Sequence, residues 1–156
     1  MNILFLDCAL STGFASLWKG VVESGSVKIT LERGESSGMR FLRFRRWLME
    51  MLVNSQGEAL YDLVAYEQSH HRGGPATHLA ENWIGRVEEE CARLGIQYTS
   101  VHTGMLKRHA SGRGNASKEE MVEAARLRWP DQVVESEDQA DALCGLAWAI
   151  ERYEPK

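Results

Sequence analysis

Four acidic residues of this sequence lie at positions where a carboxylate is expected to destabilise the folded protein. Asp7 and Glu67 each end a short apolar run of strand length, and Asp138 and Asp141 open a helix whose later residues are mostly apolar. Carboxylates at the ends of buried strands are desolvated and repel one another unless a positive charge lies between them. The pattern therefore predicts that the fold gathers the four acids around a divalent metal ion. Acid–metal clusters of this kind suit phosphodiester cleavage, in which two ions hold the attacking and leaving oxygens.

Each acid also has an ordinary structural explanation when it is taken singly. Asp7 is placed to cap the turn that follows it, Glu67 to be a surface acid after its strand, and Asp138 to meet the positive end of a helix dipole. Asp141 is harder to explain, because it shares a helix face with Asp138 but lies beyond the first turn, among apolar neighbours. Two acids on adjacent strands and two on one helix face favour a shared site.

The 156 residues predict one domain, 1–156, of the α/β class. Apolar and alternating runs predict strands at 2–8, 13–19, 27–31, 60–67 and 97–102, with turns at 19–20 and around Gly25. Helices are predicted at 37–53, 76–94, 104–109, 118–129 and 137–153, the last two starting at capping boxes on Ser117 and Ser136. This order predicts a five-stranded mixed sheet, three antiparallel strands plus two parallel, flanked by helices on both faces. Strands 2–8 and 60–67 are expected side by side and parallel, which puts Asp7 next to Glu67.

The distribution of charge matters more than its total. The formal net charge is −4, which alone argues against a nucleic-acid-binding protein. Residues 39–48 and 102–118, however, each contain four cations and no acid. We interpret 39–48 as a solvated helix face. Segment 102–118 is interpreted as a phosphate-binding region, because its glycines let a backbone approach and the helix that begins after Ser117 offers free N–H groups.

Three scattered cysteines, Cys8, Cys91 and Cys144, form no C-x-x-C pair and predict reduced thiols in an intracellular protein. The sequence begins directly with a strand, and no apolar run approaches membrane-spanning length. A cytoplasmic location and no membrane partner are therefore expected.

The acidic motifs resemble those of a known family. The segment 3–15, which contains Asp7, resembles the first strand and turn of RuvC-type Holliday-junction resolvases, in the retroviral-integrase (RNase H-like) superfamily. Ala65-Tyr66-Glu67-Gln68 resembles that family's second acidic strand, and Asp138-Gln139-Ala140-Asp141-Ala142-Leu143 resembles its C-terminal acidic helix. The resemblance covers nearly the whole chain, in the right order. The last motif is the most specific, since the first is shared with actin-like ATPases.

The resemblance implies an RNase H-like fold and a homodimeric, Mg²⁺-dependent endonuclease, with Mn²⁺ as a substitute and no nucleotide cofactor, that makes paired nicks in four-way DNA junctions. It implies that Asp7, Glu67, Asp138 and Asp141 are the catalytic metal ligands, and that the helix 76–94 forms the dimer contact. It also implies that Lys107 and Lys118 act beside the scissile strand. Contacts with DNA are expected from the following residues: His70, His71, Arg72, Lys107, Arg108, Arg113, Asn115 and Lys118.

Two departures from the family pattern are visible. The family has Pro-Gly directly after its first Asp, where this chain has Cys8-Ala9. Those residues shape a turn, so we expect the chemistry to be retained. The family's wedge aromatic, three residues after the Glu, is replaced here by His70, with His71 beside it. A histidine can stack on a base, but the change puts recognition of the junction core in question.

Other functions fit parts of the same pattern. A ribonuclease H acting on RNA–DNA hybrids would share the fold, and a non-catalytic branched-DNA-binding module would share the basic segment. An actin-like ATPase needs two such domains to clamp a nucleotide, and this chain predicts one. A zinc site at His70, His71, His78 and Cys91 fits no standard ligand spacing.

Overall fold

The central strands of the sheet are those whose residues are almost all apolar. In the computed structural model, which describes residues 1–69 and 73–154, β1 (Ile3–Asp7) and β4 (Leu63–Glu67) are each buried at the first four of their five positions. They lie side by side and parallel, as predicted. β2 (Ser11–Trp18) pairs antiparallel with β1, β3 (Val21–Lys28) pairs antiparallel with β2, and β5 (Gln97–Val101) pairs parallel with β4. The strand order is β3-β2-β1-β4-β5, which confirms the predicted mixed sheet.

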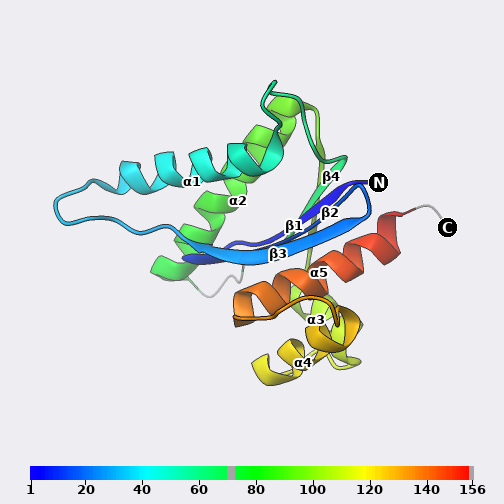
Figure 1. Cartoon of the computed structure of the whole chain (residues 1–156). Helices are drawn as coiled ribbons and strands as arrows, with labels where there is room; N and C mark the ends of the chain where they lie inside the picture. Colours follow the sequence, from blue (N-terminus) through cyan, green and yellow to red (C-terminus); the bar gives the residue numbers. More distant parts are fainter. Residues whose placement is uncertain (70–72, 155–156) are drawn as a thin grey trace.

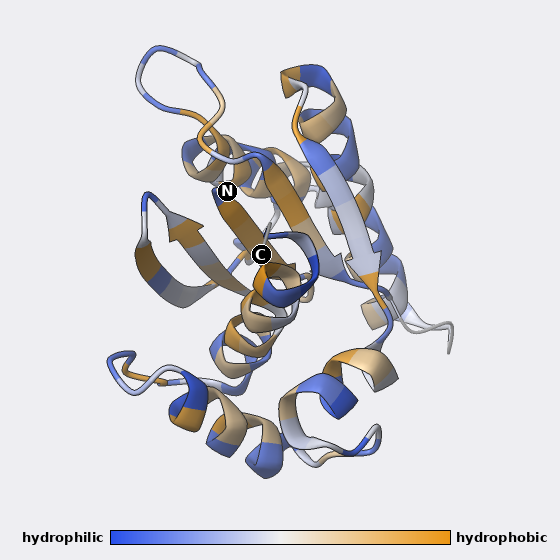
Figure 2. Ribbon diagram, turned by 90° about the vertical axis from the view of Figure 1, so that its right-hand side faces the viewer, coloured by the Kyte–Doolittle hydropathy of each residue, from blue (hydrophilic) through white to orange (hydrophobic). Residues whose placement is uncertain are grey.

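Helices cover both faces of this sheet (Figure 1). On one face lie α1 (Ser37–Leu52) and α2 (Pro75–Leu94). On the other face lies α5 (Glu137–Tyr153), with α3 (Thr103–Ser111) and α4 (Lys118–Arg128) packed beside it. Neighbouring side chains of each strand point to opposite faces of the sheet, so the buried residues of the central strands divide between two core clusters, one on each face. In Figure 2 the strands at the centre of the sheet are among the most hydrophobic parts of the ribbon.

Aromatic packing fastens the first helical layer to the sheet. Phe44 of α1 stacks on Trp83 of α2, with ring centroids 4.2 Å apart and an interplanar angle of 5°. Both side chains are fully buried. The Trp83 indole also donates a hydrogen bond of 3.0 Å to the carbonyl of Ala9, just beyond β1. This layer therefore holds the turn that follows Asp7.

The position of the third strand was predicted wrongly. It spans Val21–Lys28 rather than 27–31, and Gly25 lies inside it, opposite Phe14, instead of in a turn. A Cβ at Gly25 would lie 2.9 Å from the Phe14 ring, so the glycine marks a close approach within the strand. The turn at Lys19–Gly20 is confirmed, and both residues have positive φ, 49° and 82°.

The helix ends largely follow their predicted signals. The Ser117 capping box is complete, and Gly95 ends α2 in the left-handed conformation. Ser136 caps α5 through the Gln139 N–H, but the second half of its box is absent. The Gln139 side-chain oxygen instead accepts a hydrogen bond of 2.8 Å from the Glu135 N–H. α3 is longer than the predicted 104–109.

Within residues 1–69 and 73–154, no helix has the length and apolar character needed to cross a membrane. All three cysteines are free and buried, and burial raises the pKa of each thiol, to about 12 for Cys91 and Cys144. Such thiols are protonated and unreactive at neutral pH.

Candidate active site

Asp7 and Glu67 lie side by side at the carboxyl ends of two central strands of the sheet. Leu6 and Tyr66 are partners in the parallel ladder of β1 and β4, and each acid is the next residue on its strand. Both strands end at these acids, so the two carboxylates leave the apolar core at the same place. The predicted adjacency is confirmed.

Gly13 brings the first turn of α5 against these strand ends. In the antiparallel ladder Gly13 is the partner of Asp7. A Cβ built on Gly13 would lie 1.9 Å from the backbone oxygen of Asp138, so only glycine allows α5 to begin here. Two turns further along the helix, Gly145 does the same over Phe5, where a Cβ would lie 2.1 Å from the ring. Two close contacts of backbone thus set how near Asp138 lies to Asp7.

The pKa of Asp7 shows which charged groups lie near its carboxylate. Burial raises this pKa well above its ordinary value, and the charges of Glu67, Asp141 and Asp138 raise it further. The positive charge of Lys118 opposes the rise. All four predicted acids are therefore close enough to interact through their charges.

Asp141 carries the same signature. Burial raises its pKa from 3.8 to about 7, with additional contributions from Glu67 and Asp138. Lys107 and Lys118 lower it. The six residues predicted to be catalytic thus form one electrostatic unit, with four acids from three elements and one lysine from each of two neighbouring helices.

Thr103 belongs to the site and was missed by the sequence analysis. Its hydroxyl donates a hydrogen bond to the Glu67 carboxylate. Thr103 is the first residue of α3, directly after β5, whose Val101 is the ladder partner of Glu67. Lys107 follows one turn later, on the same side of the helix. A threonine four residues before a predicted site lysine, next to a strand end, is the signal that could have found it.

Lys118 is tied to the start of α5. It is the first residue of α4, and its ammonium forms a 2.8 Å ion pair with Glu137. Both side chains are exposed, so the pair holds Lys118 near Asp138 and Asp141 without removing its charge from solvent.

Comparison with known proteins identifies the fold. No family model and no curated protein matches the chain. The solved structure of Thermus thermophilus RuvC matches it with a TM-score of 0.72 and 19% sequence identity, over 97% of this chain and 96% of that one. T. thermophilus RuvC in complex with a Holliday junction substrate matches with the same TM-score and 18% identity, over 92% and 89% of the two chains. The chain has a RuvC-like fold. The order of acidic motifs in the sequence thus corresponds to a fold that matches over almost the whole length.

The acids of this RuvC-like fold form a donor set suited to a hard divalent cation. Asp7, Glu67, Asp138 and Asp141 offer only carboxylate oxygens, the ligands that Mg²⁺ and Mn²⁺ prefer. The carboxylates of Asp7 and Asp141 form no hydrogen bond or ion pair with another described residue, although both are largely desolvated. Among residues 1–69 and 73–154, no three His, Cys, Asp or Glu side chains converge as a ready-made metal site. The four carboxylates are close enough to shift the pKa values of Asp7 and Asp141, and carboxylate oxygens are suitable ligands for a divalent cation.

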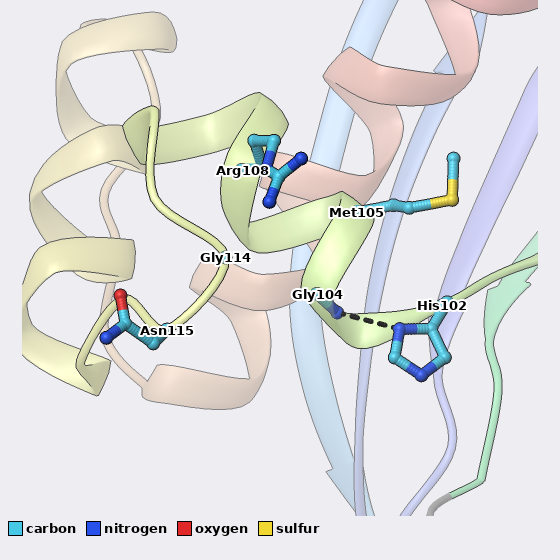
Figure 3. Close-up of a pocket in the computed structure, with 6 residues that line it drawn as sticks. All are labelled: His102, Gly104, Met105, Arg108, Gly114 and Asn115. Carbon is cyan, nitrogen blue, oxygen red and sulfur yellow. Dashed lines mark hydrogen bonds between the residues drawn. The ribbon is translucent and has the colours of Figure 1, made fainter.

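The other basic residues of the RuvC-like fold divide into paired and unpaired ones. Arg113 forms a 3.0 Å ion pair with Glu120. Arg108, by contrast, has no ionic partner among the described residues. It lines a hollow of about 520 Å³ beside α3, together with His102, Gly104, Met105, Gly114 and Asn115 (Figure 3). The predicted DNA contacts His70, His71 and Arg72 lie outside the described residues.

Two of the four arginines of 39–48, Arg43 and Arg45, form ion pairs within this RuvC-like fold. Arg43 pairs with Glu35, and Arg45 pairs with Glu90, which is buried and also binds Arg93. These contacts lie on α1 and the segments that pack against it, and they agree with the predicted helix face.

The zinc hypothesis finds no support from the two of its ligands that are described. Cys91 is fully buried in the core between α2 and the sheet, whereas His78 is exposed. A core cysteine and an exposed histidine more than three helical turns apart do not share a metal ion.

Proposed function

We propose that the chain is a divalent-metal-dependent endonuclease that cuts branched DNA, four-way junctions above all. One observation carries the proposal: Asp7, Glu67, Asp138 and Asp141 gather at the carboxyl ends of β1 and β4, where burial and the neighbouring carboxylates raise the pKa of Asp7 and of Asp141 and the charges of Lys107 and Lys118 oppose the rise at Asp141. The RuvC-like fold supports it, because one of the matching structures is of a RuvC bound to a Holliday junction.

In this proposal the acidic residues bind the metal ions and the lysines bind the DNA strand. Asp7, Glu67, Asp138 and Asp141 would hold Mg²⁺, or Mn²⁺ in its place. When bound, such ions supply the charge that stabilises the attacking and leaving oxygens of phosphodiester hydrolysis. Lys107 and Lys118 bind the phosphates of the strand, because they are the cations that already compensate Asp141.

Thr103 and the buried setting of Asp7 prepare the site for a reaction. The Thr103 hydroxyl donates a hydrogen bond to the Glu67 carboxylate and so helps to fix the orientation of that side chain. The apolar core beneath Asp7 limits water at the strand ends. These arrangements preorganise negative charge where a cation and a phosphate have to meet.

The substrate and the assembly follow from the same proposal. A four-way junction is two-fold symmetric, so paired nicks require two sites related by a two-fold axis. One chain supplies one site, and a homodimer is therefore part of the proposed function. A cytoplasmic place of action beside chromosomal or phage DNA, without a nucleotide cofactor, completes it.

The test compares substrates with and without metal. Labelled four-way junction, linear duplex and RNA–DNA hybrid are incubated with the protein in Mg²⁺ or in excess chelator, with Asp7→Asn as the inactive control. We expect symmetric nicks in the junction only, only in Mg²⁺, and none by the variant. Preferential cutting of the hybrid would make the protein a ribonuclease H. Full activity in chelator would overturn the metal mechanism, and junction binding without cutting in Mg²⁺ would leave a binding module.

A further inference from the structure

The hollow beside α3 lies on a different face of this helix from the residues that interact with the carboxylates. Thr103 and Lys107, four residues apart, serve the carboxylate side, because one binds Glu67 and the other lowers the pKa of Asp141. Gly104 and Arg108, also four residues apart, line the hollow. Each pair is shifted by one residue from the other, so the two faces adjoin around the helix axis. A strand that crosses the carboxylates and follows the surface of α3 therefore has a path to the hollow.

The floor of the hollow is backbone. A Cβ on Gly114 would lie 3.3 Å from the Gly104 carbonyl oxygen, so the loop after α3 packs against the first turn of the helix with no side chain between them. Figure 3 shows the residues that line the hollow: Gly104, Met105 and Arg108 on α3, His102 just before it, and Gly114 and Asn115 on the loop that follows. Because His102, Met105, Arg108 and Asn115 are exposed, the hollow is open to solvent and suits a segment of chain better than a compact enclosed ligand.

Arg108 supplies the positive charge of the hollow. Two of the four cations in 102–118 already have a carboxylate partner: Arg113 pairs with Glu120 and Lys118 pairs with Glu137. Arg108 is exposed and has no carboxylate partner in the described part of the chain. Its guanidinium and the Asn115 amide are donors of the kind that bind phosphate oxygens.

Met105 supplies an apolar surface. Its side chain is 60% exposed, although it stands on a helix whose Leu106 is fully buried. An exposed, polarisable thioether beside an unpaired guanidinium fits a nucleotide, which presents an apolar base face next to a charged phosphate.

We propose that this hollow binds the nucleotide adjacent to the cleaved phosphodiester, with its phosphate on Arg108 and its unstacked base against Met105. The proposal rests on the proposed function, because it places the strand at the carboxylates first. It adds a recognition subsite for an unpaired nucleotide, the kind of nucleotide that a branch point in DNA supplies.

The test couples the arginine to one phosphate. A series of junctions carries a neutral methylphosphonate at each position flanking the nick in turn, and binding is measured by fluorescence anisotropy in excess chelator, so that no DNA is cut. Arg108→Ala should weaken binding to the unmodified junction severalfold and reduce its salt slope by about 1. At one flanking position the methylphosphonate should weaken the wild type by the same factor and leave Arg108→Ala unchanged.

Two further variants separate the parts of the subsite. Arg126→Ala removes an exposed arginine on α4, outside the hollow, and should show no coupling to any position. Met105→Ala should weaken binding with no change of salt slope, because it removes apolar contact and no charge. The side chains of Arg108 and Met105 are exposed, so the melting temperatures of Arg108→Ala and Met105→Ala should match that of the wild type.

The outcomes distinguish this inference from the proposed function. If the wild type binds and cuts junctions, but Arg108→Ala and every methylphosphonate weaken binding additively, the hollow is not a phosphate subsite. If Arg126→Ala shows the same coupling, the effect is general charge and the inference is also overturned. If the wild type binds no nucleic acid, the proposed function itself fails.

Discussion

The folded environment of Asp141 disfavours the ionised form of its carboxylate. In the folded protein its pKa is about 7, against an ordinary value of 3.8, because burial and then the charges of Glu67 and Asp138 disfavour ionisation. The folded state thus binds the proton more tightly than the unfolded chain. The stability that Asp141 contributes is complete below about pH 4 and is lost as the pH rises through about 7. Such a residue is retained for something other than stability.

Asp141→Asn should therefore stabilise the metal-free protein while abolishing cleavage. At pH 8 in chelator we expect the free energy of unfolding to rise by about 1–3 kcal/mol, with a smaller fall in stability between pH 4 and pH 7. Urea unfolding across this pH range measures both effects. In Mg²⁺ the same variant should bind junctions at least as tightly as the wild type and cut none. Wild-type cleavage by the variant would reduce Asp141 to a helix-start acid.

Thr103 acts through Glu67 rather than on the substrate. Thr103→Val keeps the shape of the side chain and removes the hydroxyl that binds the carboxylate. Loss of such a supporting hydrogen bond should weaken Mn²⁺ binding by roughly 10- to 100-fold, measured by electron paramagnetic resonance without DNA. The apparent Mg²⁺ requirement for cleavage should rise in parallel. Thr103→Ser restores the hydroxyl and should restore both readouts, whereas equal Mn²⁺ affinity in all three proteins would contradict the role.

At the scale of elements, the site depends on how closely α5 lies on the sheet. Gly13→Ala would place a methyl group 1.9 Å from the Asp138 backbone oxygen, so helix or strand has to move. We expect a loss of about 1–3 kcal/mol in unfolding free energy, the usual cost of overpacking. Cleavage should fall by more than stability explains, because Asp138 and Asp141 move with the helix. Gly38→Ala on α1 is the matched control, since its Cβ meets only the Ser36 hydroxyl at 3.6 Å and should be tolerated.

The elements also show what the sequence was able to predict and why. β1 and β4 are central, so both faces are buried and their apolar runs end clearly at Asp7 and Glu67. β3 is an edge strand with no fully buried position, so its pattern was weak and its glycine was taken for a turn. The same limit hid the role of Gly13, whose reason is a contact with a residue 125 positions away. The ionic partners of Arg113 and Lys118 also depend on folding, so the sequence showed the two charges but not the glutamates that pair with them.

At the scale of the whole molecule, the apolar stripe of α2 is already used. Trp83, Val87 and Cys91 are buried in the chain's own core, so a dimer through α2 has to use the opposite face of the helix. Gly85 lies on that face: it is exposed, and a Cβ there would meet nothing within 4 Å. A large side chain at Gly85 is therefore harmless to the isolated fold and obstructive to a partner packed against it.

Gly85→Arg should separate the dimer from the fold. Light scattering at micromolar concentration should give twice the 17.6 kDa chain mass for the wild type and a single chain mass for the variant, with unchanged circular dichroism. Gly38→Arg places the same residue on α1 and should remain dimeric. With one site per particle, Gly85→Arg should nick one strand of a four-way junction at a time, because paired nicks need both sites of a two-fold assembly. A wild type that is monomeric both alone and on the junction, and that nicks one strand only, would make the protein a single-strand nickase instead of a resolvase.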